Sequence, residues 1–131
     1  AHPQEGRELM RRNPSFVFFR ELEGAGSGDD GPLGAGGAAL TPGRSLAVDR
    51  RFLPLGLPVW LDAEHPLRPG ERLRRLLLAQ DTGGAIKGPV RGDLFWGAGA
   101  EAEQIAGAMK SRGGYYLLLP RAAARRLAGT S

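Results

Sequence analysis

The strongest constraint on the fold is an apolar strand that runs directly into an aspartate and two glycines. Residues 72–80 contain the run Leu76-Leu77-Leu78-Ala79, and residues 81–84 read Asp-Thr-Gly-Gly. An apolar run of this kind predicts a strand that is buried on both faces. Because the glycines after it favour an open turn, we expect the strand to deliver Asp81 to a cleft at the end of a sheet.

A second aspartate follows twelve positions later in similar surroundings. Asp93 lies between Gly92 and Leu94, and the chain has only six aspartates in all. A carboxyl group that stays protonated in apolar surroundings can act as a general acid. Aspartates beside glycine are also common in simple turns. The occurrence of both motifs together favours a catalytic site at Asp81 and Asp93.

Turn-forming residues divide the rest of the chain into short elements. With 21 glycines and 10 prolines, the sequence favours short strands over long helices. The apolar patterns predict strands at 15–22, 45–48, 58–61 and 115–119, helices at 5–12 and 100–110, a glycine-dense loop at 23–37, and a helix or frayed tail at 121–128. Gly113 and Gly114 are expected to end the second helix. This pattern predicts a mainly β fold, most simply a small barrel.

Composition narrows the class of protein without identifying it. The net charge is +4, but the basic residues form no single run, so we predict no nucleic-acid partner. No apolar segment approaches the ~20 residues of a membrane span, and the sequence contains no cysteine. His2 and His65 lie far apart and lack neighbours at ligand spacing. We therefore predict neither a metal site nor a cofactor.

Several separate motifs, in this order, resemble those of one known family. The matching stretches are residues 13–19, 40–49, 52–56 and 80–97. They resemble the C-terminal part of the membrane-bound lytic transglycosylase A family, which carries a three-aspartate (3D) domain. The resemblance identifies Asp49, Asp81 and Asp93 as the three aspartates.

The resemblance also implies a fold and a division of the chain. It implies that the small barrel is a six-stranded double-psi β-barrel with short peripheral helices. The barrel would span residues 13–120, after an N-terminal helical lead-in at 1–12 and before a basic C-terminal tail at 121–131. These boundaries are predictions that depend on the family pattern.

The activity implied by the resemblance is that of a peptidoglycan lytic transglycosylase, a carbon–oxygen lyase. Such an enzyme cleaves the β-1,4 bond between N-acetylmuramic acid and N-acetylglucosamine and forms a 1,6-anhydromuramic product. Asp93 would be the single acid and base, and ionised Asp81 would stabilise the developing positive charge. Asp49 is expected to be structural.

The same resemblance suggests which residues bind the glycan. Gly83 and Gly84 would let a glycan approach the backbone closely, with Thr82 beside them. Lys87 would bind sugar or peptide groups or neutralise Asp81. Phe95 and Trp96 follow Asp93 directly, so they are expected either to stack on a sugar or to pack in the core.

Partners and location follow from the family as well. Peptidoglycan glycan strands are the expected partner, and an upstream half with an inserted domain, absent from this sequence, would complete the groove. The parent protein is expected in the periplasm, associated with the outer membrane, with membrane contact only through an anchor outside this chain.

Two other functions fit some of the same residues. A non-catalytic, expansin-like module that binds cell-wall polysaccharide would use the same barrel. Residues 81–83, Asp-Thr-Gly, also form the active-site triplet of aspartic proteases. Those enzymes prefer serine or alanine where this chain has Gly84, which counts against a protease.

Overall fold

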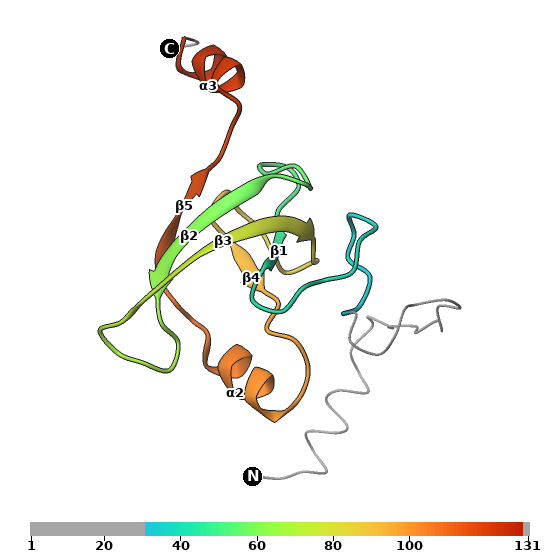
Figure 1. Cartoon of the computed structure of the whole chain (residues 1–131), viewed down its shortest axis with the longest axis vertical. Helices are drawn as coiled ribbons and strands as arrows, with labels where there is room; N and C mark the ends of the chain where they lie inside the picture. The colour runs from blue at the N-terminus through green and yellow to red at the C-terminus, as the bar shows by residue number, and fades with distance from the viewer. Residues whose placement is uncertain (1–30, 130–131) are drawn as a thin grey trace.

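A computed structural model describes residues 31–129 and shows one curled sheet with two helices (Figure 1). The described strands are β1 (Ser45–Val48), β2 (Pro58–Glu64), β3 (Arg72–Asp81), β4 (Gly92–Leu94) and β5 (Gly113–Leu117), and the helices are α2 (Ala100–Ala108) and α3 (Arg121–Ala128). The order across the sheet is β4-β1-β3-β2-β5. The mainly β class is therefore confirmed, with five strands in this part of the chain.

Strands β2 and β3 form the long antiparallel pair on which the sheet is built. Their register runs from Pro58 opposite Leu78 to Glu64 opposite Arg72. Asp62 on β2 forms ion pairs of 2.6 Å with Arg72 and 3.1 Å with Arg74 on β3. These cross-strand pairs support the register, because opposite charges on neighbouring strands attract each other.

Strand β1 lies in the sheet between β3 and β4. It pairs in parallel with β3 and antiparallel with β4, so it links the two segments that carry the aspartates. The β1–β3 register shifts between Leu46 and Ala47. As a result Ala47 lies opposite Asp81 on one side and opposite Asp93 on the other.

The hydrophobic core lies on one face of this sheet. It consists of ten buried side chains: Leu46, Val48, Leu53, Val59, Leu61, Ala63, Leu73, Leu77, Ala79 and Leu94. Strand β3 contributes Leu73, Leu77 and Ala79, which alternate with more exposed residues, as expected for one buried face. The prediction that its apolar run is buried on both faces is wrong, because Leu76 is 44% exposed and Leu78 is 37% exposed.

Other predicted elements need smaller corrections. The strands predicted at 45–48, 58–61 and 72–80 are confirmed, with β2 three residues longer and β3 one residue longer. Strand β4 was not predicted. Gly113 and Gly114 do not end a helix; they begin β5, which stops at Leu117. The helix at 5–12 and the strand at 15–22 lie outside the described residues.

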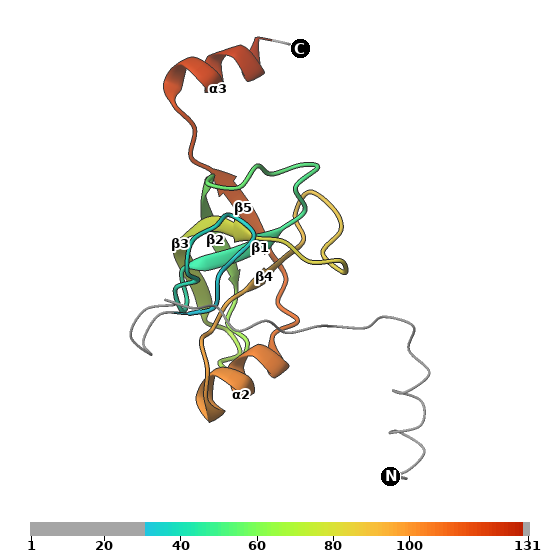
Figure 2. The same ribbon diagram turned by 90° about the vertical axis from the view of Figure 1, so that its right-hand side faces the viewer.

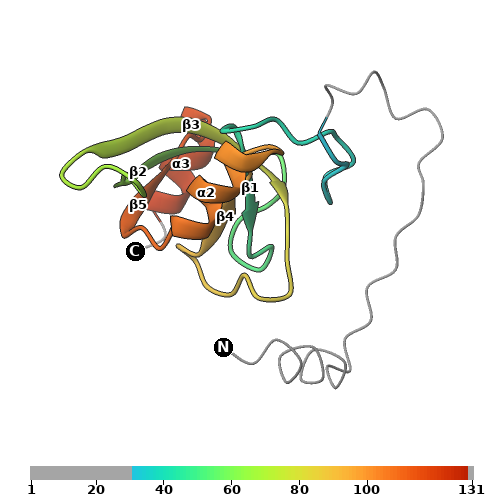
Figure 3. The ribbon, with the colours of Figure 1, turned by 90° about the horizontal axis from the view of Figure 1, so that it is seen from below.

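The two helices lie at opposite ends of the sheet (Figures 1 and 2). Helix α2 connects β4 to β5 and lies across one end of the curled sheet in the view from below (Figure 3). Helix α3, the basic segment at 121–128, projects from the other end. Neither helix in the described part of the chain is long and apolar enough to cross a membrane.

The alternating burial of β3 predicts that truncating two neighbouring leucines lowers the free energy of unfolding by different amounts. Leu77 is 2% exposed, so Leu77→Ala should lower the free energy of unfolding by about 2–5 kcal/mol through lost apolar contacts and a cavity. The matched change Leu76→Ala, on the outer face, should alter it by only about 0.5 kcal/mol. Urea unfolding of both variants measures the difference. Equal losses would mean that the outer face is also buried in solution.

Candidate active site

Three side chains in a row across neighbouring strands define the candidate site. Directly paired residues point to the same face of a sheet, so Asp81 on β3, Ala47 on β1 and Asp93 on β4 share one face. Adjacent strands lie about 4.8 Å apart, which separates the two aspartate backbones by roughly 10 Å. The small methyl group of Ala47 lies between the two carboxyl groups.

This row opens into a cavity of about 280 Å³. Its lining residues are Leu40, Ser45, Ala47, Asp81, Thr82, Ile86, Asp93, Leu94 and Phe95. The predicted pair of carboxyl groups therefore meets in one cavity, together with Thr82 and Phe95. Apolar side chains form most of the rest of the wall.

Asp81 is half-buried and held by the backbone of a distant segment. It is the last residue of β3, as the sequence predicted for a residue delivered to a cleft. The Ala35 N–H donates to its Oδ1 over 3.0 Å. The described residues direct no other hydrogen bond to this carboxyl group, which lines the cavity.

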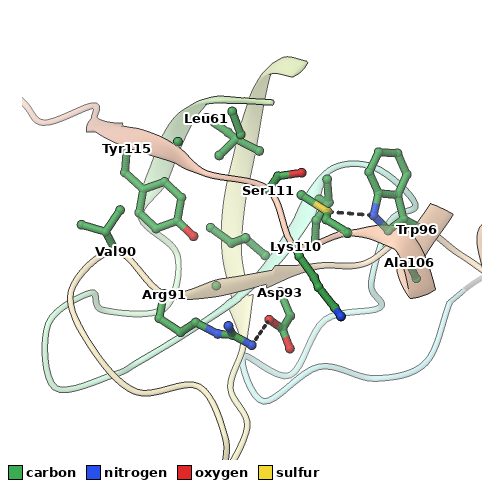
Figure 4. Close-up of a pocket in the computed structure, with 15 residues that line it drawn as sticks. Leu61, Val90, Arg91, Asp93, Trp96, Ala106, Lys110, Ser111 and Tyr115 are labelled. Atoms are coloured by element: carbon green, nitrogen blue, oxygen red, sulfur yellow. Dashed lines mark hydrogen bonds and ion pairs between the residues drawn. The ribbon is translucent and has the colours of Figure 1, made fainter. Parts of the chain in front are cut away.

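Asp93 lies in a more open position than apolar surroundings would suggest. Its side chain is 58% exposed, and Arg91 Nη2 lies 3.2 Å from its Oδ1. Both residues also line a second cavity, of about 740 Å³, between β4 and β5. Figure 4 shows the Arg91 side chain turned toward Asp93, with Lys110 extending into the same opening. Asp93 thus has water and two cations in its surroundings.

Tyr115 faces Asp93 across the larger cavity. Burial raises the pKa of Tyr115 to about 12, and the nearby negative charge of Asp93 adds to this effect. A side chain on Gly92 would collide with the Tyr115 hydroxyl and would lie 3.0 Å from the Ala47 carbonyl oxygen. The glycine before Asp93 is therefore explained by close packing, since β4 is a strand and not a turn.

The two aromatic side chains that follow β4 have different surroundings, although Trp96 also lines the larger cavity with Asp93. Phe95 lines the cavity of the two aspartates. Trp96 packs against the core; its Nε1–H donates to Met109 Sδ over 3.3 Å and its ring lies 5.4 Å from the Arg75 guanidinium carbon. Alternation along an extended chain separates neighbouring side chains in this way.

The other predicted binding residues lie in the loop from 82 to 91, which joins β3 to β4. Ile86 N–H donates to the Gly83 carbonyl over 3.0 Å and closes a turn. Gly84 and Lys87 are exposed in this loop. Gly83, Gly84 and Lys87 do not line the cavity of the aspartates.

Sequence reasoning missed several residues that shape the site. Ala35 and Ala47 have no reactive side chain that a sequence motif could reveal. Ala35 contributes its backbone N–H, and Ala47 leaves room between the two carboxyl groups. Arg91 and Asp93 are two residues apart, and this spacing would have placed them on one face had β4 been recognised as a strand.

Asp49 anchors the loop that connects the two aspartates of the site. Asp49 is 5% exposed, and its carboxylate accepts hydrogen bonds from Arg51 Nη2 (2.6 Å), the Arg51 N–H (3.1 Å) and the Gly88 N–H (2.8 Å). The Arg51 side chain, and then the Gly88 N–H, hold the pKa of Asp49 well below its ordinary value of 3.8. A charged, buried Asp49 therefore fixes the 82–91 loop to the end of β1.

This anchor predicts a pH-dependent stability effect. The folded state depresses the pKa of Asp49 below 3.8, so its stabilising contribution is present above about pH 4 and is lost as the pH falls further. Asp49→Asn removes the charge with little change in shape. The melting temperature of the variant should fall below that of the parent at pH 7, and the gap should close toward pH 2. The exposed Asp93→Asn is the control and should show little gap. A gap for Asp49→Asn that stays constant with pH contradicts the anchor.

The fold and site define a class: a β-sheet module with two aspartates on one face and a glycine-rich loop between them. Residues 44–119, more than half of the chain, match the 3D domain family. The chain belongs to the 3D domain family.

Relatives and solved structures are similar to this chain over most of its length. Membrane-bound lytic murein transglycosylase A of Vibrio cholerae is 41% identical over 114 residues, which cover 82% of this chain and 28% of that protein. The crystal structure of a membrane-bound lytic murein transglycosylase from Agrobacterium tumefaciens is 42% identical, with a TM-score of 0.80, over 95% of this chain and 34% of that one. E. coli MltA with bound chitohexaose is 36% identical, with a TM-score of 0.74, over 91% of this chain and 35% of that one. The chain thus spans under a third of the curated relative's length.

Proposed function

We propose that this chain carries the catalytic aspartates of a peptidoglycan lytic transglycosylase. The observation that carries the proposal is the row of Asp81, Ala47 and Asp93, which places two carboxyl groups on one face around one cavity. Similarity to proteins named lytic murein transglycosylases supports the reaction class. The structure with chitohexaose supports a β-1,4-linked glycan as the ligand.

In the proposed reaction Asp93 transfers a proton in both directions. Protonated Asp93 donates its proton to the glycosidic oxygen as the bond from C1 of N-acetylmuramic acid breaks. Asp93 then accepts the proton of the C6 hydroxyl group as that oxygen forms a bond to the same C1. The products are a free hydroxyl on N-acetylglucosamine and a 1,6-anhydro ring, and no water is consumed. One carboxyl group suffices, whereas a hydrolase needs two.

Asp81 and Arg91 have different roles in this scheme. The ionised Asp81 carboxylate, across Ala47 from Asp93, stabilises the positive charge that develops at C1. Arg91 pairs with Asp93 through a contact between two exposed side chains, and such pairs are weak. A bound glycan can therefore displace Arg91 and leave Asp93 free to carry a proton.

We propose that the glycan extends beyond the two carboxyl groups along the 82–91 loop. Thr82 and Phe95 line the cavity, so they are placed to contact the sugar at the cleavage site. Gly83, Gly84 and Lys87 would contact sugars further along the glycan, where the loop is exposed. Trp96 would act mainly by holding the segment after β4 against the core.

We also propose that the five described strands belong to a six-stranded double-psi β-barrel. Strands β4 and β5 are the two edges of the sheet, and the larger cavity separates them. Edge strands expose unpaired backbone groups that can pair with another strand. A strand placed between them would close the barrel and cover the apolar floor at Leu46 and Leu61.

The proposal extends to the division of the chain and to the location of the parent protein. The barrel would span residues 13–120, with a lead-in at 1–12 and a basic tail at 121–131. A further domain would form the opposite wall of the glycan groove. The membrane-bound relatives support a periplasmic parent that is associated with the outer membrane.

The two aspartates should respond differently to loss of charge. Asp93→Asn cannot transfer a proton, so turnover should fall by at least about 10⁴-fold, the upper end for general acid–base catalysis. Asp81→Asn should cost about 10²–10³-fold, as for other groups that stabilise a transition-state charge. Both variants should fold and bind glycan. Activity is measured as release of anhydro-muropeptides from peptidoglycan by a protein that includes the second domain. If Asp93→Asn keeps its activity, Asp93 is not the group that transfers the proton and the assigned roles of the two aspartates are wrong.

The space above Ala47 should control access to the carboxyl groups. Ala47→Val suits a strand but fills the gap between Asp81 and Asp93, so glycan affinity should fall about tenfold or more while the melting temperature changes little. The control is Ala122→Val on α3, which projects away from the sheet. Titration calorimetry with chitohexaose measures both. Unchanged affinity in Ala47→Val would place the glycan elsewhere.

Mass spectrometry of digested peptidoglycan tests the reaction class itself. Products that lack the mass of one water confirm the transglycosylase, and products that contain it indicate a hydrolase. Binding of glycan strands without any cleavage would favour the polysaccharide-binding module.

A further inference from the structure

A hairpin formed by residues 31–40 lies against the end of β3, far from it in sequence. Leu33 and Ala39 form an antiparallel bridge, and Leu40 N–H donates to the Pro32 carbonyl over 2.9 Å. Figure 1 draws the segment in cyan beside the end of β3. The sequence predicted only a glycine-dense loop here, but the described part is ordered by its own hydrogen bonds.

Two consecutive backbone N–H groups of this hairpin bind the end of β3. Gly36 N–H donates to the Gln80 carbonyl over 2.9 Å, and Ala35 N–H donates to Asp81 Oδ1 over 3.0 Å. The first bond fixes the hairpin to the strand backbone. The second fixes one oxygen of the carboxyl group relative to that backbone.

Glycine at position 34 is required by this contact and not by backbone conformation. A Cβ atom on Gly34 would lie 2.6 Å from the Gln80 carbonyl oxygen and 2.6 Å from Leu40 Cδ2, while its φ is not in the left-handed region. Gly37, at the turn, shows the opposite case: its φ is +79° and the space around it is open. The hairpin therefore carries a glycine where it must approach β3 most closely.

We infer that the 31–40 hairpin is a positioning element for Asp81. Through the Ala35 N–H it holds Oδ1, and so it orients the other carboxylate oxygen toward the cavity that Asp81 shares with Asp93. The catalytic role of the hairpin rests on the proposed function, whereas the orientation of Asp81 does not depend on it. Ala35 acts through Asp81 and has no contact with the reacting atoms.

A backbone N–H is well suited to this task. It has no side-chain rotamers, so it stays beside the carboxylate as long as the Gly36–Gln80 bond holds the hairpin on β3. Leu40, at the end of the hairpin, is 7% exposed and lines the same cavity. The hairpin thus contributes both an orienting donor and part of the apolar wall.

The kinetic test uses a pair of glycine variants. Gly34→Ala should push the hairpin away from β3, and misplacement of a catalytic group by about 1 Å can cost about 10²-fold. We expect that loss in kcat with little change in KM, because the interaction affects the transition state. Gly107→Ala in α2, where the added methyl group meets open space, is the control and should keep full activity. Two results for Gly34→Ala would contradict the inference. One is a rise in KM as large as the fall in kcat, and the other is full activity.

An NMR titration tests the orientation without any activity assay. In the unmodified protein the amide resonance of Ala35 should shift with the same pH midpoint as the side-chain carboxyl carbon of Asp81. In Asp81→Asn the Ala35 amide should lose that titration, and in Gly34→Ala it should be strongly reduced. An Ala35 amide that does not follow Asp81 overturns the inference. If it follows Asp81 while a protein that includes the second domain releases no anhydro-muropeptides, the proposed function fails and the positioning role stands.

Discussion

The site depends on one irregularity in the sheet: the register shift where β1 meets β3. Before the shift Leu46 lies opposite Ala79, and after it Ala47 lies opposite Asp81, so β3 has one extra residue, Gln80. An extra residue in one strand changes which side chains face which side of a sheet. The shift therefore turns Asp81 to the face on which Ala47 and Asp93 lie.

Surrounding contacts hold that irregularity in place. Ser45 Oγ donates to the side-chain oxygen of the extra residue, Gln80, and the Gln80 carbonyl accepts the Gly36 N–H. On the other side of the site, Asp49 binds Gly88 and so fixes the loop that leads to Asp93. Each contact joins segments that are distant in sequence, which explains how short strands with many glycines can keep two carboxyl groups in a defined arrangement.

Much of this arrangement could be predicted from the sequence, and the missing parts have physical reasons. The apolar run that ends at Asp81 predicted β3, because a strand needs only a local pattern. Strand β4 was missed, because it is three residues long and is defined by pairing with β1. The alternating burial of Leu76 and Leu77 depends on whether a second layer covers the sheet, which the run alone cannot show. Ala35 contributes only a backbone group, so no residue pattern could have identified it.

NMR mapping of glycan binding tests whether the row of Asp81, Ala47 and Asp93 is the glycan site. Chitohexaose is added to the isotope-labelled chain, and the shift of each backbone amide is followed. We predict that the largest shifts occur at Ala47, Thr82, Asp93 and Phe95, around the smaller cavity. No shift at saturating sugar, or shifts gathered at Trp60 on β2 and Tyr116 on β5, away from the smaller cavity, would contradict this assignment.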